Sequence, residues 1–224
     1  MAAFIGINPA TGEKISEYNR ITGSEALEKI AASKKEYLQW QQKTFEERAS
    51  LMYALADIFD KNKEEYAQLA TREMGKVIGQ SRKEIEKCAL VCRYYAEHAA
   101  TLLADENVKT EATKSYITFQ PIGVILAVMP WNFPFYQVIR FAIPALMAGN
   151  TGVLKHASNV QGCAFAIEDA FVKAGFHRGV FMNLNVESKE VKTLIEDKNI
   201  AAITLTGSDP AGRSVASIAG QNLK

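Results

Sequence analysis

The second half of the chain alternates short apolar runs with longer amphipathic segments, and this pattern constrains the fold more than any other feature. Four apolar runs have the length of buried strands, and a segment with helical spacing follows each of them. Because strands joined by helices pair in parallel, the pattern predicts an α/β fold with an open, parallel, Rossmann-like sheet and helices on both faces. We predict strands at 123–129, 152–155, 180–184 and 200–206, and helices at 135–148, 159–174, 188–196 and from Pro210 onward.

The first half, from about 22 to 104, has the apolar spacing of helices. Gly75 is predicted to end one helix, and a long amphipathic helix follows at 77–103. Apolar and polar side chains alternate at residues 115–119, which indicates a half-exposed strand. Three residue pairs have the spacing of a capping box: Thr22 with Glu25, Thr44 with Glu47, and Asn62 with Glu65. We divide the chain 1–224 into a helical segment at about 22–104, a strand region at about 106–120 and a parallel α/β part at about 121–224.

The segment Pro130-Trp131-Asn132-Phe133-Pro134 directly follows the first predicted strand. Proline restricts the backbone on both sides, so the Asn132 amide would be presented in one direction. An amide N–H donates without titrating, which suits the stabilisation of an oxyanion. In the alternative interpretation, Asn132 caps the next helix and Trp131 fills the core.

Two further motifs also lie at the carboxyl ends of predicted strands, where ligands bind in open parallel sheets. Gly207-Ser208-x-x-x-Gly212 precedes a helix, so its backbone N–H groups and the helix dipole suit an anion. Lys155 ends the strand at 152–155. The alternatives are an ordinary turn for the first motif and a solvated surface charge for Lys155.

These three motifs, in this order, resemble those of the aldehyde dehydrogenase superfamily. The resemblance runs from Asn8-Pro9-Ala10-Thr11-Gly12 to about Gly220, and the details are most similar to the succinate-semialdehyde dehydrogenase branch. It implies that Asn132 stabilises the oxyanion and that Phe133 and Gln137 line the substrate pocket. It also implies cofactor contacts from Met129, Pro130, Trp131, Lys155, Ser158, Gly207 and Ser208, with the last two holding the pyrophosphate.

Ser158 bears on the choice of cofactor. Members of the family often have a glutamate at this position, where it holds the ribose hydroxyls and disfavours a 2′-phosphate. A small neutral side chain leaves room for that phosphate, so we expect NADP or NAD to be bound, with NADP accepted. One departure from the family is Asn185-Val186-Glu187-Ser188, which lacks a glycine that many members place there.

Arg140 lies eight positions after Asn132, within an otherwise apolar predicted helix. A buried guanidinium is costly unless it is paired or faces a cavity. The resemblance to succinate-semialdehyde dehydrogenases implies that Arg140 binds the distal carboxylate of the substrate, because a guanidinium binds a carboxylate bidentately. We therefore expect an ω-carboxylated aldehyde. The alternative is a structural ion pair, which would leave another aldehyde as substrate.

The family's general base lies in a Glu-Leu-Gly-Gly segment and its nucleophile is a later cysteine, and this sequence has neither. Cys88, Cys92 and Cys163 lie in contexts typical of core packing. We therefore expect the amino-terminal, cofactor-binding part of a longer enzyme, or a truncated product, with the catalytic domain absent and no activity alone. A non-catalytic dinucleotide-binding or assembly module is the alternative.

Bulk properties exclude several classes of protein. The net charge of +1 gives no footprint for nucleic acid, and residues 1–6 do not resemble a secretory signal. The longest apolar stretch is interrupted by prolines and Arg140, so no membrane span is predicted, and three cysteines suit a reducing, cytoplasmic location. His98, His156 and His177 have no metal-ligand spacing and are predicted in loops or at the surface. The resemblance implies a homo-oligomer, a dimer or tetramer, joined through the strand region.

Overall fold

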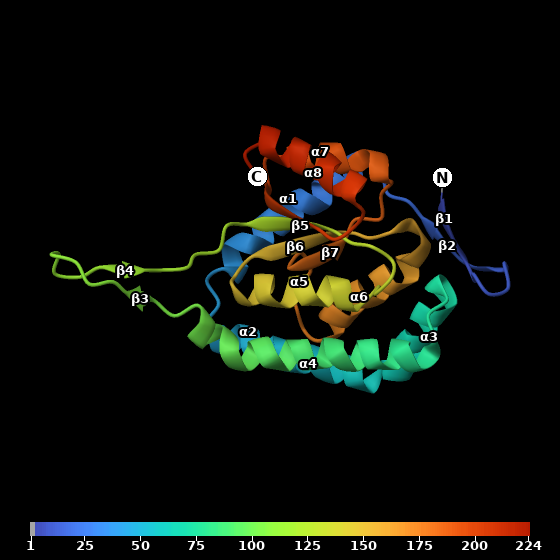
Figure 1. Ribbon diagram of the computed structural model, residues 1–224, viewed down its shortest axis with the longest axis horizontal. Helices are drawn as coiled ribbons and strands as arrows, with labels where there is room; N and C mark the ends of the chain where they lie inside the picture. The colour runs from blue at the N-terminus through green and yellow to red at the C-terminus, as the bar shows by residue number, and fades with distance from the viewer. Residues whose placement is uncertain (1–2) are drawn as a thin grey trace.

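The computed structural model describes residues 3–224 and has a four-stranded parallel sheet at its centre (Figure 1). The strand order is β7-β6-β5-β8, and every pairing within this sheet is parallel. This confirms the predicted open α/β sheet. The strands are β5 (Val124–Val128), β6 (Thr151–Lys155), β7 (Phe181–Asn183) and β8 (Ile200–Leu205).

Helices cover both faces of this sheet, so alternate residues of β5 belong to two different hydrophobic cores. Val124 and Leu126 pack with α1, α7 and α8, whereas Ala127 packs with α5 and α6. Figure 1 shows the two groups of helices on opposite sides of the strands. The helices are α1 (Gly23–Trp40), α5 (Tyr136–Met147), α6 (Gln161–Lys173), α7 (Val191–Glu196) and α8 (Asp209–Gln221), with 3₁₀ turns η1 (Ser158–Val160) before α6 and η2 (Ser188–Glu190) before α7.

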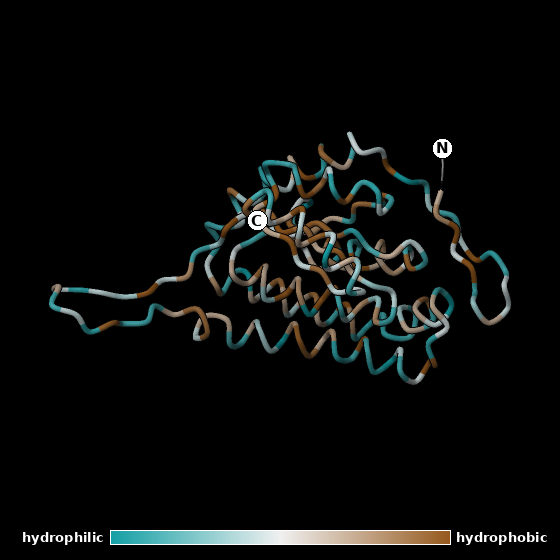
Figure 2. The backbone as a smooth tube through the Cα atoms, turned by 45° about the horizontal axis from the view of Figure 1, so that its top comes forward, coloured by the Kyte–Doolittle hydropathy of each residue, from teal (hydrophilic) through white to brown (hydrophobic). Residues whose placement is uncertain are grey.

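Three more helices form an outer layer that packs on α5 and α6 rather than on the sheet: α2 (Phe45–Lys61), α3 (Lys63–Met74) and α4 (Ile78–Leu102). Figure 1 shows α4 running along the bottom of the molecule. In Figure 2 the brown colour that marks hydrophobic residues is concentrated between the layers and along the strands. Buried side chains of this layer, including Phe59 and Tyr66, contact Phe135 at the start of α5.

The helix ends follow the predicted signals in all but one case. Thr22 and Thr44 each form a complete capping box, and Gly75 ends α3 in the left-handed conformation with φ of 77°. Asn62 precedes α3 at its N-cap position, as predicted, but its side chain makes no capping hydrogen bond there. Asn62 is the only residue between α2 and α3, and its side-chain amide donates to the carbonyl of Ile58 at 3.0 Å, so it serves the end of α2.

A hairpin that was not predicted from the sequence pairs β1 (Ala3–Ile7) with β2 (Lys14–Asn19). The hairpin lies against α6 and η1 on the right of Figure 1. The side chain of Asn185 donates to the carbonyl of Asn19 at 2.7 Å, and the Ile21 N–H donates to the Asn185 carbonyl at 3.1 Å. The hairpin is thus fixed by residues from the far end of the chain.

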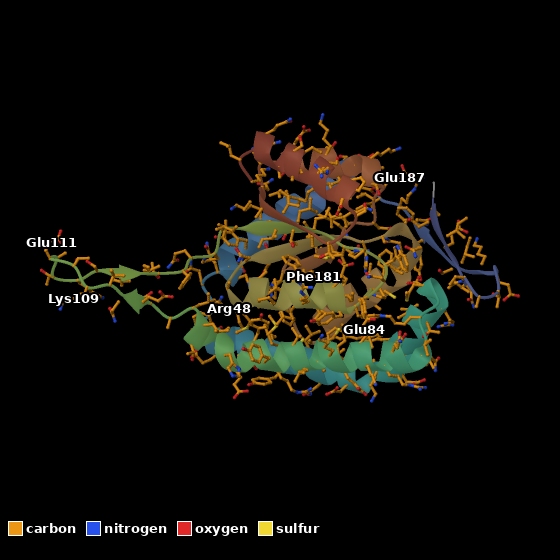
Figure 3. The ribbon with its side chains drawn as sticks, in the orientation of Figure 1. Arg48, Glu84, Lys109, Glu111, Phe181 and Glu187 are labelled. Carbon is orange, nitrogen blue, oxygen red and sulfur yellow. The ribbon has the colours of Figure 1, made fainter. Side chains whose placement is uncertain are left out.

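A second hairpin projects from the body as a long arm (Figure 1). It pairs β3 (Glu106–Asn107) with β4 (Tyr116–Ile117), and Lys109 and Glu111 lie near its tip in Figure 3. The strand predicted at 115–119 is therefore much shorter than expected, because only β3 pairs with it among the described residues. In the same part of the chain, 3–224, no helix combines the length and apolar content needed to cross a bilayer.

Candidate functional site

Parallel pairing brings the three predicted motifs to one edge of the sheet. Val128, near the end of β5, is in register with Lys155 on one side and Leu205 on the other. The Met129 N–H donates to the Lys155 carbonyl, and the Thr206 N–H donates to the Val128 carbonyl, both at 3.1 Å. The loops after β5, β6 and β8 therefore leave the sheet side by side.

The loop after β5 exposes the Asn132 side chain instead of using it in a cap. Trp131 and Phe133 are also exposed, at 51% and 43%, so Trp131 does not fill the core. Helix α5 begins after Phe135 with no capping side chain of its own. Among the hydrogen bonds of residues 3–224, none involves the Asn132 amide. The alternative interpretation of this motif as a helix cap is therefore wrong.

The start of α5 is capped from another layer by Glu84, which lies on α4 and is labelled in Figure 3. One carboxylate oxygen, Oε1, accepts the N–H groups of Phe135 and Tyr136, each at 2.9 Å. The other oxygen accepts the ammonium of Lys76, and both side chains of this ion pair are buried. Sequence analysis missed Glu84 because nothing local to a helical glutamate reveals a backbone partner 51 residues away.

His156 is buried, which corrects the predicted surface or loop position. Its Nδ1 accepts the Ala157 N–H at 2.9 Å, so the proton is on Nε2, which donates to the Pro134 carbonyl at 2.8 Å. Burial lowers the pKa of His156 to about 4, although its hydrogen bonding to the Pro134 and Met129 carbonyls opposes this shift in part. The imidazole is therefore a neutral donor that fixes the end of the loop carrying Asn132.

Lys155 is also buried, with only 6% of its surface exposed, so it is not a solvated surface charge. Burial lowers its pKa, and its Nζ donates to the Ser188 hydroxyl at 3.0 Å. Lys155 and the exposed Ser158 line a cavity of about 310 Å³. Glu187 borders the same cavity, and its carboxylate is paired with Arg20 and Lys189, which offsets the negative charge.

Gly207 and Ser208 are exposed at the start of α8. Ser208 occupies the N-cap position, its side chain makes no capping hydrogen bond, and this uncapped helix start borders an open cavity of about 600 Å³. Arg213 and Asp209 line that cavity with opposite charges. The geometry is that of an anion site whose backbone donors are not occupied by the chain's own side chains.

The three residues predicted to bind substrate lie along α5 and the loop before it, around two adjoining cavities. Arg140 and Gln137 line one of about 490 Å³, together with Met129. Gln137 also lines the other, of about 390 Å³, with Phe133. Arg140 is exposed and takes part in none of the ion pairs of residues 3–224. The structure therefore gives no support to a structural ion pair within the described chain.

The cysteines are free and buried, as predicted for core residues. Burial raises the pKa of all three thiols, Cys88, Cys92 and Cys163, well above that of a free cysteine. None of these thiols therefore has the character of an activated nucleophile. Within the described residues, no group of three or more histidine, cysteine or acidic side chains has a geometry that could hold a metal ion.

The fold and the arrangement of these loops agree with comparisons to known proteins. The sequence profile of the aldehyde dehydrogenase family matches residues 2–224, and the chain belongs to that family. It is 49% identical over 222 residues to a probable succinate-semialdehyde dehydrogenase [NADP(+)] of Synechocystis sp., covering 99% of this chain and 49% of the relative. It is 47% identical over 221 residues to succinate-semialdehyde dehydrogenase [NADP(+)] 1 of Mycobacterium tuberculosis, covering 97% and 48%.

Solved structures show the same architecture. Succinic semialdehyde dehydrogenase from Streptococcus pyogenes, in complex with NADP+, superposes with a TM-score of 0.96 at 34% identity. The match covers 99% of this chain and 49% of that one. The chain thus spans about half the length of the relatives it matches. These comparisons confirm the resemblance to the succinate-semialdehyde dehydrogenase branch.

The buried imidazole predicts a pH dependence of stability. The unfolded chain binds the His156 proton near pH 6.5 and the folded chain only near pH 4, so the folded state loses stability as pH falls through this window. The loss should total roughly 3 kcal/mol. Urea unfolding measured between pH 7.5 and 4.5 checks it. His156→Gln keeps a neutral donor and should flatten this part of the curve, whereas His177→Gln, at an exposed site, should follow the original protein. Identical curves for all three would contradict the assignment.

Proposed function

We propose that this chain provides the cofactor site and the oxyanion-stabilising amide of an NADP-dependent aldehyde dehydrogenase that oxidises succinate semialdehyde or a similar ω-carboxylated aldehyde. The observation that carries the proposal is the free Asn132 amide on a fixed loop at the strand ends that also carry Lys155 and Gly207. In this proposal residues 121–224 form the cofactor-binding part, residues 22–104 support it, and residues 106–120 serve assembly.

The proposed chemistry assigns Asn132 a single role. When a nucleophile adds to the aldehyde carbon, the carbonyl oxygen becomes an oxyanion, and the Asn132 side-chain N–H groups donate to it. The bound dinucleotide supplies the hydride acceptor. The three buried thiols are not suited to be the nucleophile. The proposal therefore assigns the nucleophile and the general base to residues outside this sequence, and it expects no turnover from the chain alone.

The polar groups at the strand ends fit a phosphorylated dinucleotide. The Lys155 ammonium and the Ser188 hydroxyl lie together in one cavity, and the exposed Ser158 adds a small neutral side chain to its rim. The uncapped start of α8 offers backbone N–H groups for a pyrophosphate. Two relatives are named as NADP(+)-dependent enzymes, and one solved relative contains NADP+, which supports NADP as the preferred cofactor with NAD also bound.

A carboxylate at position 158 should discriminate between the two cofactors. Ser158→Glu places a negative charge where the 2′-phosphate of NADP is proposed to lie, and we expect about tenfold weaker binding of NADP with a smaller change for NAD. Calorimetric titration of the purified chain measures both. Ser217→Glu, on the exposed surface of α8, is the control for added charge. Equal losses for both cofactors, or no binding of either at millimolar concentration, would contradict the proposed site.

The proposed substrate class depends on Arg140. Its guanidinium is exposed in the cavity shared with Gln137, and it has no ion pair within residues 3–224. A carboxylate is the group that a planar guanidinium binds bidentately. An aldehyde whose far end carries a carboxylate would therefore be oriented by Arg140, while its carbonyl reaches Asn132 on the loop before the same helix.

Arg140→Ala tests this assignment in a form of the enzyme that also carries the nucleophile. Loss of a charge-assisted bidentate contact should lower kcat/KM for succinate semialdehyde by roughly one to two orders of magnitude. Arg140→Lys keeps the positive charge but cannot bind a carboxylate bidentately. Its kcat/KM for succinate semialdehyde should therefore lie between that of the original enzyme and that of Arg140→Ala. The kcat/KM for butanal, which has no carboxylate, should fall only slightly. The ratio of the two losses decides the outcome, and equal losses for both aldehydes would make Arg140 a structural residue.

The arm formed by β3 and β4 supports a proposal of homo-oligomeric assembly. Its two short strands have free edges among the described residues. It also carries four exposed apolar side chains: Val108, Tyr116, Ile117 and Phe119. We propose that the arm pairs with another copy of the chain to give a dimer or tetramer.

Free, buried thiols agree with the reducing environment of the cytoplasm as the proposed location.

Analytical ultracentrifugation over a wide range of concentration measures this assembly. The chain should sediment as a dimer or larger species, and Ile117→Asp should shift it toward monomer because a charge at a buried interface is costly. Lys109→Glu, near the tip of the arm, is the matched control and should leave the mass unchanged. A monomer at every concentration would exclude assembly through the arm.

A further inference from the structure

Glu84 determines where α5 begins, although it belongs to a different helix. It lies on the 25-residue helix α4, is buried, and accepts the Phe135 and Tyr136 N–H groups at 2.9 Å each. Helix α5 has no capping side chain of its own. The start of α5 at Tyr136, four residues after Asn132, is therefore held by a carboxylate on the outer helical layer.

Lys76 extends the same contact to the residue next to Asn132. Its ammonium is paired with Glu84 and lies 3.6 Å from the centroid of the Phe133 ring. A cation over an aromatic face is attracted by the electron density of the ring, and more strongly when both are shielded from water. The Lys76–Glu84 pair thus contacts both Phe133 and Phe135, on the carboxyl side of Asn132.

We propose that Glu84, with Lys76 as its partner, is a positioning residue that aims the Asn132 amide at the oxyanion. The proposal rests on the proposed function of Asn132. A donor lowers a reaction barrier only when it already points to where charge develops, and a displacement of about 1 Å can cost ~100-fold in rate. Asn132 makes no side-chain hydrogen bond with any of residues 3–224, so its direction depends on the backbone on either side.

The chain contains a matched control for this role in Glu73 on α3. Glu73 is buried and accepts the Gly162 and Cys163 N–H groups at 2.8 and 2.9 Å, which caps α6 as Glu84 caps α5. Both glutamates thus do the same structural work for a helix on the same face of the sheet. Only Glu84 adjoins the loop that carries Asn132, so only its loss should affect that loop.

The first test uses this chain alone and needs no activity. The chain has two tryptophans, Trp131 in the loop and the buried Trp40, whose indole N–H donates to the Leu146 carbonyl at 3.0 Å. In ¹⁵N relaxation of the two indole groups, Glu84→Gln should lower the heteronuclear NOE of Trp131 and leave that of Trp40 unchanged. Glu73→Gln should change neither. An unchanged Trp131, or an equal change in both variants, would overturn the proposal.

The second test is a kinetic cycle in a form of the enzyme that carries the nucleophile. Glu84→Gln should lower kcat about tenfold with little change in KM, and should cause no further loss when Asn132 is already alanine. Glu73→Gln should leave kcat unchanged. If Glu84→Gln lowers kcat by the same factor in the Asn132→Ala variant as in the original enzyme, Glu84 does not act through Asn132. If Asn132→Ala itself leaves kcat unchanged, the proposed function fails, whereas the relaxation result still decides whether Glu84 holds the loop.

A double variant separates positioning from folding. Glu84→Gln leaves the Lys76 ammonium buried without its anion, which can destabilise the chain strongly, whereas removing both charges in K76M/E84Q is much less costly. We expect this double variant to regain most of the lost unfolding free energy, measured with urea, while kcat stays low. Recovery of kcat together with stability would show that Glu84 supports the fold only and would overturn the proposal.

Discussion

The parallel pairing of β5 with its two neighbours is the constraint on which the site depends. Parallel strands end at the same edge of a sheet, so residues far apart in sequence leave it together. Lys155 and Leu205 are both in register with Val128. A one-residue slip of β5 would reverse which of its residues face each core, and it would also turn the loop carrying Asn132 away from Lys155. Packing of the core and alignment of the site are therefore specified by the same register.

The outer helical layer contributes charge as well as apolar contacts to this arrangement. Glu73 and Glu84 each reach from that layer to the N-terminal N–H groups of a helix that lies on the sheet. A buried carboxylate is costly unless its lone pairs are satisfied, and these two are satisfied by backbone donors that would otherwise lack partners. Burial raises the pKa of Glu73, and its hydrogen bonds from Gly162 and Cys163 oppose that effect. The polar contacts thereby fix how the two layers are placed relative to each other.

The features that sequence predicted well are those with local causes. Each strand of the sheet is a short apolar run, and the caps at Thr22 and Thr44 depend on residues three positions apart. The positions of Asn132, Lys155 and Gly207 at strand ends follow from the same runs, although their roles remain predictions. The buried state of His156 was missed because its partners, the Pro134 carbonyl and the Ala157 N–H, are set by the fold. Glu84 was missed for the same reason, since its backbone partners lie more than 50 residues away, whereas the β1–β2 hairpin is a local pairing of residues 3–7 with residues 14–19.

The placement of the β1–β2 hairpin has a consequence for synthesis on the ribosome. Asn19 is bonded to Asn185, a partner that is made 166 residues later. At about 5–20 residues per second, Asn19 waits on the order of ten to thirty seconds before Asn185 has been made. Helices α1 to α4 emerge during that interval. Helix α1 lacks its partners in the sheet until β5 and β6 follow, and α2 to α4 lack α5 and α6. Helices α2, α3 and α4 contact one another, but their docking on the rest of the fold waits for the second half of the sequence.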